Sequence, residues 1–152
     1  MDANYINGFL SAIQEVFLSL GLGELTKDKV YKKDSFNSKY ELTTIIGISG
    51  NNKGNVSISM EYDTVKKIAS AMMMGMPVDE INEMVLSAIG EMANMICGHA
   101  VMKLNNLNKN MDITPPTVIH GSDAKVSFGK RDTITVDLNT SMGKVEFNLS
   151  LQ

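Results

Sequence analysis

The chain has 152 residues, of which 43% are hydrophobic and 20% charged, as expected of one globular domain with its own core. A net charge of -3 argues against a nucleic-acid-binding surface, and the single cysteine excludes an internal disulfide. The first residues lack the basic and apolar regions of a signal peptide, and no uncharged run approaches the roughly 18 apolar residues of a membrane span. We therefore expect a cytoplasmic protein that binds neither nucleic acid nor membrane.

The first half of the chain predicts a helix, two strands and a second helix. Apolar residues recur at helical spacing over residues 5–20, and glycines end that helix. A polar stretch follows and leads to β-branched or alternating segments at residues 42–49 and 56–60, which a turn sequence joins. Asp63 can cap the second helix, which we expect to run to about Met74 before Gly75 and Pro77 end it.

The second half predicts a long helix followed by strands. Asp79 is expected to open the helix, which reaches about Leu104 before an Asn- and Lys-rich segment. Strand patterns follow at residues 117–119, 126–128, 133–138 and 145–151.

Methionine is unusually frequent, with twelve in the chain and no tryptophan. Methionine fills irregular cores and also coats adaptable binding surfaces. Both readings are open for the cluster of Met72, Met73, Met74 and Met76, and we expect core packing.

Two passages of the chain resemble each other in the same order. Leu10-Ser-Ala-Ile-Gln-Glu15 returns as Leu86-Ser-Ala-Ile-Gly-Glu91, and Gly54-x-Val-x-Ile-x-Met60 returns as Gly143-x-Val-x-Phe-x-Leu149. Any two amphipathic helices look alike, but the paired match favours an internal duplication. The pattern predicts an α+β fold, with one pseudo-two-fold antiparallel sheet and long helices packed on it. The halves would span about residues 4–76 and 79–152 of a single domain.

Most catalytic and metal-binding signatures are absent from the sequence. It has no phosphate-binding loop, no His-Glu-x-x-His, no Cys-x-x-Cys and no Gly-x-Ser-x-Gly. His99 is expected near the apolar face of its helix and His120 after a strand, without Cys or carboxylate partners at ligand spacing. We expect no metal site and no cofactor of the protein's own, and we expect Cys97 to be a small buried hydrophobe.

The third helix carries a polar stripe that is separate from its core stripe. At about 100° per residue, Ser87, Glu91 and Asn94 fall within an arc of roughly 60°. Glu91 and Asn94 are neighbours at i and i+3, so they can address one small target together. The core stripe comprises Ile81, Val85, Ile89, Met92 and Ile96. A solvated face is the ordinary explanation of such a stripe, and Glu-x-x-Asn alone is a weak signal.

The residues at fixed distances from Glu91 and Asn94 turn this weak signal into a specific motif. Ser87-x3-Glu91-x2-Asn94, followed by twenty-one residues and Pro116, resembles the signature of the CheC/CheX/FliY chemotaxis phosphatases. The segments at residues 87–98 and 113–121 are similar to the best blocks of that family. The resemblance covers most of the chain and implies the duplicated fold, with phosphatase activity toward the phosphoaspartate of a CheY-like response regulator.

The first copy of the motif is degenerate, which is the pattern of the CheX branch. It reads Ser11-x3-Glu15-x2-Leu18, and Tyr40 stands where the count would place the proline. CheC-like members usually carry two active copies, so this chain is most similar to CheX. The resemblance also implies a homodimer built through sheet edges.

The resemblance assigns roles to the second copy. Asn94 would hold a water in line with the phosphorus, and Glu91 would pair with the receiver's lysine; Ser87 and Pro116 would be supporting residues. The receiver would supply Mg²⁺. The alternative is a non-catalytic receiver-binding or flagellar-switch module in which Glu91 docks and nothing is hydrolysed. A binding module has no need of the amide of Asn94 beside the glutamate, so we favour the phosphatase.

Overall fold

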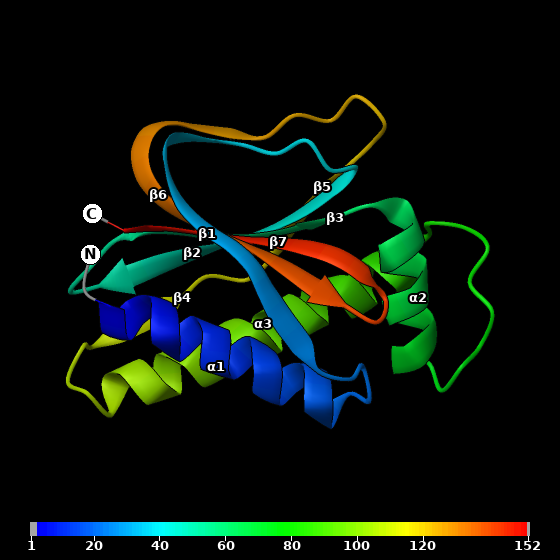
Figure 1. The fold of residues 1–152 in the computed structure, drawn as a ribbon, viewed down its shortest axis with the longest axis horizontal. Coiled ribbons are helices and arrows are strands. Elements are labelled where there is room, and N and C mark those ends of the chain that lie inside the picture. Colours follow the sequence, from blue (N-terminus) through cyan, green and yellow to red (C-terminus); the bar gives the residue numbers. More distant parts are fainter. Residues whose placement is uncertain (1–2, 152) are drawn as a thin grey trace.

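A computed structural model describes residues 3–151, without the side chains of residues 35–37 and 128–131. Within this part of the chain, seven strands form one sheet in which every pairing is antiparallel, and helices cover one face of it (Figure 1). The predicted α+β class is confirmed. The elements are α1 (Ala3–Ser19), β1 (Leu25–Asn37), β2 (Leu42–Gly50), β3 (Gly54–Met60), α2 (Tyr62–Met72), α3 (Glu83–Asn105), β4 (Met111–Ile113), β5 (Thr117–His120), β6 (Ser127–Thr140) and β7 (Gly143–Leu151).

The sheet places the two repeated strands side by side at its centre. Its order is β1-β6-β7-β3-β2-β4, and β5 also pairs with β2. β3 and β7 are the strands that share the Gly-x-Val pattern, and they pair with Val56 opposite Leu149 and Met60 opposite Val145. Strands of the two halves also pair with each other. β1 of the first half pairs with β6 of the second, and β4 and β5 of the second half pair with β2 of the first. This exchange around a central antiparallel pair gives the sheet the pseudo-two-fold arrangement that the sequence repeat predicts.

The repeated helices α1 and α3 pack against each other on the sheet, running in opposite directions (Figure 1). A core of buried apolar side chains lies between these helices and the sheet. Phe9 of α1 meets Phe147 of β7 there, with ring centroids 5.6 Å apart. Burying a side chain of this size contributes about 1.5–3 kcal/mol, so the apolar faces of the helices fix their orientation on the sheet.

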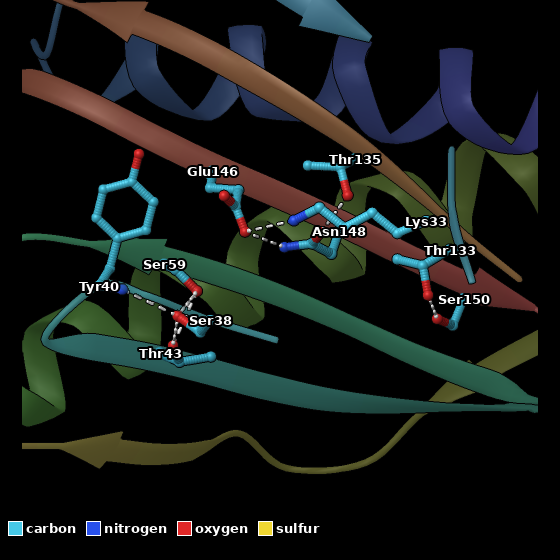
Figure 2. Close-up of polar contacts among 10 residues, drawn as sticks. All are labelled: Lys33, Ser38, Tyr40, Thr43, Ser59, Thr133, Thr135, Glu146, Asn148 and Ser150. Atoms are coloured by element: carbon cyan, nitrogen blue, oxygen red, sulfur yellow. Dashed lines mark hydrogen bonds and ion pairs between the residues drawn. The ribbon is translucent and has the colours of Figure 1, made fainter. Parts of the chain in front are cut away.

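The opposite face of the sheet is also buried but polar (Figure 2). Asn148 donates to Glu146 at 3.0 Å and accepts from Thr135 at 2.6 Å, and Lys33 lies 3.7 Å from the Glu146 carboxylate. Ser38 bridges Thr43 and Ser59, and Thr133 bonds Ser150. These named groups satisfy one another, and their hydrogen bonds hold the strands of this face together. The candidate site residues are on the helical side.

The structure differs from the sequence expectation in the strands. The polar stretch after the first helix is β1, a sheet-edge strand rich in lysine. Edge strands often carry charges on both faces, which hides the alternating pattern of a strand. The strands expected at residues 126–128 and 133–138 are one continuous strand, β6, and the Asn-rich segment leads into the short strand β4.

The helix starts were also placed wrongly. α3 begins at Glu83, not Asp79, because Asn82 caps it by accepting from the backbone N–H of Val85 at 3.0 Å. α2 begins one residue before Asp63, whose side chain therefore lies in the first turn and is not the cap.

The methionine cluster divides between the two roles. Met72 and Met73 pack against the core as expected, but the expectation was wrong for the other two. Met74 is 97% exposed and Met76 is 61% exposed. Both lie in the connection that follows the end of α2.

Candidate functional site

The outward face of α3 carries the predicted polar stripe. Its core stripe is buried as expected, apart from the half-buried Ile81, which precedes the helix. Ser87 and Glu91 are exposed, and Asn94 is half-buried beside them on the next turn. The 3.6-residue period thus buries one side of α3 and presents these three polar residues on the other.

Pro116 lies beside the helix at the level of Glu91, although it is distant in the sequence. A Cβ atom added at Gly90 would lie 3.7 Å from Cγ of Pro116 and 3.6 Å from Val118 of β5. Pro116 therefore supports α3 at the residue immediately before Glu91. The proline ring restricts its own backbone, so the support is stiff.

The side chains of Glu91 and Asn94 are free within the described part of the protein. No hydrogen bond or ion pair joins either of them, or Ser87, to another described residue. A carboxylate accepts hydrogen bonds from a cation, whereas a carboxamide can accept and donate at once. The two groups together can hold a cation and orient a water or an oxyanion next to it.

The corresponding residues of α1 are in a different state. Glu15 accepts a hydrogen bond from Lys103 of α3 at 2.6 Å, and its other oxygen lies 3.7 Å from Nδ1 of His99. The Lys103 hydrogen bond, with help from His99, lowers the pKa of Glu15 below its usual value. Leu18 stands exposed at the position that Asn94 has in α3. Tyr40 lies in the β1–β2 connection, where its backbone N–H donates to Oγ of Ser38 on the polar face of the sheet (Figure 2).

Sequence reasoning missed the contact between Glu15 and Lys103. His99 was expected near the apolar face, but it is exposed and faces Glu15. The pair spans 88 positions and depends on how α1 and α3 pack, so no local pattern could have indicated it. A shallow cavity of about 250 Å³ lies here, lined by Glu15, His99, Met102, Lys103 and Asn106.

The other reactive side chains have structural roles. Cys97 is buried as predicted, and burial raises the pKa of its thiol to about 12. Among the residues that the structure describes, no three His, Cys, Asp or Glu side chains are grouped closely enough to hold a metal ion.

By length and composition alone, α3 could cross a membrane. The expectation from the sequence did not include α3 because it considered only uncharged runs, whereas a membrane span tolerates a few charges. Nine residues of α3 are buried in the core of this fold, which accounts for its apolar character.

Comparison with known proteins gives consistent matches. The family model described as chemotaxis phosphatase CheX matches residues 42–139. The CheY-P phosphatase CheX of Thermotoga maritima is 39% identical over 130 residues, which are 85% of this chain and 84% of that protein.

Solved structures match over nearly the whole fold. A CheC-like superfamily protein from Shewanella sp. PV-4 has a TM-score of 0.90 and 25% identity, covering 100% of this chain and 99% of that one. The complex of CheX with CheY, BeF₃ and Mg²⁺ from Borrelia burgdorferi matches with a TM-score of 0.83 and 28% identity, over 97% of each chain.

Proposed function

Because this chain belongs to the CheX family of chemotaxis phosphatases, we propose that it dephosphorylates a CheY-like receiver domain with Glu91 and Asn94 of α3. The family membership predicted from the segments at residues 87–98 and 113–121 is confirmed, and with it a phosphatase activity toward a response regulator. The observation that carries the residue assignment is the free carboxylate and amide on adjacent turns of α3, beside Pro116.

Asn94 is the water-positioning residue. Phosphoryl transfer asks little covalent chemistry of a protein, and most of the rate comes from placing the nucleophile in line with the phosphorus. The amide oxygen of Asn94 accepts a hydrogen bond from the water while its nitrogen donates to a phosphoryl oxygen. Its half-buried position restricts the side chain, which favours one orientation.

Glu91 binds the receiver. Its exposed carboxylate has no partner among the described residues, so it is available to the lysine beside the phosphoaspartate. An ion pair at this point sets the register in which Asn94 meets the phosphoryl group. Ser87 and Pro116 support this arrangement, Ser87 from the preceding turn and Pro116 from beneath the helix.

Mg²⁺ comes with the receiver in this proposal. The Borrelia burgdorferi complex contains Mg²⁺ together with CheY, and the described residues of this chain form no cluster of metal ligands. The ion neutralises charge on the phosphoryl oxygens, and this chain contributes only the amide and the carboxylate.

We further propose how the chain is organised into halves and how it assembles. Residues 1–152 form one domain, in which the half over about residues 4–76 is degenerate and the half over 79–152 is active. The protein works in the cytoplasm as a homodimer joined through sheet edges. The long edge strand β1 offers unpaired backbone groups for such a joint.

A direct experiment measures phosphate release from a phosphorylated CheY-like receiver with and without this protein. We expect faster release that requires Mg²⁺ at the concentration the receiver itself needs. Calorimetry of the protein alone with Mg²⁺, Mn²⁺ and Zn²⁺ should show no stoichiometric site of micromolar affinity. Binding to the receiver without faster release would support the interaction module instead.

A further inference from the structure

Gly98 lies on the same outward face of α3 as the site residues. At about 100° per residue, it falls between Asn94 and Glu91 in direction, roughly 20° from Ser87. It is one turn beyond Asn94, about 6 Å along the helix axis. Gly98 therefore continues the row of Ser87, Glu91 and Asn94 towards the C-terminal end of α3.

The folded chain gives no reason for a glycine here. Glycine in a helix interior is destabilising relative to alanine, so it is normally kept for close packing or for a positive φ. A Cβ atom at Gly98 would have no described atom within 4 Å outside its own helical turn. Gly98 lies inside the uninterrupted helix α3 and does not have a positive φ.

The other glycines of the described helices differ in this respect. A Cβ atom at Gly8 of α1 would lie 3.3 Å from Leu104, and one at Gly90 would touch Pro116 and Val118. Both positions face neighbouring elements of the protein. Gly98 alone among them faces open space.

Two exposed methionines flank the row. Met84 and Met102 point roughly 60° from Ser87, one before the row and one after it, and are 63% and 68% exposed. Exposed, flexible apolar side chains at both ends of a polar row are typical of a surface that adapts to a partner protein.

We propose that Gly98 is the point at which the receiver domain lies closest to α3, with a loop of the receiver packed directly on the helix backbone. This inference rests on the proposed function, since a receiver whose phosphoaspartate meets Asn94 also covers the next turn of the helix. The missing side chain lets the two backbones approach, as glycines do between packed helices. Gly98 thereby selects receivers by the shape of that loop.

The test depends on the prediction that replacing Gly98 makes the protein more stable but weakens its binding to the receiver. Gly98→Ala and Gly98→Gln should each raise Tm by a few degrees, because both residues form helices better than glycine. Their Kd for a receiver loaded with Mg²⁺ and BeF₃, which stands for the phosphoryl group, should rise about tenfold for alanine and more for glutamine. Gly8→Ala is the matched control and should leave Kd within about twofold.

Each other outcome overturns the inference. If either Gly98 variant binds the loaded receiver as tightly as the wild type, no close contact exists at this turn. If Tm falls in both variants, the chain itself needs the glycine. These results are distinguishable from failure of the proposed function, in which the wild type itself neither binds the loaded receiver nor speeds phosphate release.

Discussion

The two copies of the repeated helix share the pattern Leu-Ser-Ala-Ile-x-Glu but present their glutamates differently. In α1, Glu15 is held by Lys103 and approached by His99. In α3, Glu91 has no partner among the described residues. The residue three positions on is Leu18 in the first copy and Asn94 in the second. A shared fold therefore does not give the two copies a shared chemistry.

The lengths of the helices explain part of this difference. α3 has 23 residues and α1 has 17. The last turns of α3 carry His99 and Lys103 alongside α1, where they reach Glu15. α1 ends at Ser19, and the positive φ angles of Gly21 and Gly23 turn the chain away. Within the described residues, α1 has no equivalent extension that covers Glu91, so the second copy stays open.

The largest effect should come from reversing the charge of the open glutamate. Glu91→Lys should abolish receiver binding because a like charge would face the receiver's lysine, and Glu91→Ala should weaken binding without abolishing it. Titration with the BeF₃-loaded receiver measures both. Normal binding by Glu91→Lys would mean that the proposed ion pair does not exist.

Asn94→Ala should separate chemistry from docking. The dephosphorylation rate at saturating receiver should fall by about two orders of magnitude, since the water loses its positioning group. The Kd for the BeF₃-loaded receiver should change little. Equal losses of rate and affinity would instead assign Asn94 to docking.

Pro116→Ala tests the support beneath the open copy. Loss of the ring contact at Gly90 should loosen α3 next to Glu91 and lower kcat about tenfold, because small misplacements are costly in positioning catalysis. Pro115→Ala is the matched control, since Pro115 is the adjacent, exposed proline and should leave kcat unchanged. Similar losses in the two variants would remove Pro116 from the site.

Glu15→Gln in the closed copy should have the smallest effect. Turnover should stay within about twofold, because Leu18 cannot hold a water and exposed ion pairs contribute little. The folded state lowers the pKa of Glu15, so its contribution to stability is present above the unfolded pKa and is lost as pH falls through the folded value. The small Tm difference from wild type should therefore be present at pH 7 and shrink as the pH falls through the folded pKa. A constant difference across that range would exclude the Lys103 pair as its source.

The parts of the fold that the sequence could predict are those with a strong period. α1 and the stripe on α3 follow the helical repeat, and β3 and β7 follow a strand alternation that is copied in the two halves. β1 was missed because it is an edge strand on which Lys27, Lys29 and Lys32 are exposed, so apolar alternation is not needed there. The start of α3 was misplaced because Asp79 and Asn82 are both good capping residues, and the structure uses Asn82.

The candidate site was predictable in the same uneven way. The spacing of Glu91 and Asn94 on one helix puts them together in any fold, and the family resemblance added Pro116. That Glu15 is paired was not predictable, because its partner Lys103 lies 88 positions further along the chain and on another helix. Local spacing fixes which groups share a face, whereas packing between elements decides which of them are free.

The central claim, that only the second copy does the chemistry, is tested most directly by erasing each copy in turn. The measurement is the single-turnover dephosphorylation rate at saturating phosphorylated receiver, for Glu15→Ala/Leu18→Ala and for Asn94→Ala. We expect the first variant to keep the wild-type rate within about twofold and the second to lose about two orders of magnitude. A comparable loss in the folded first variant, or an undiminished rate in Asn94→Ala, would contradict the account.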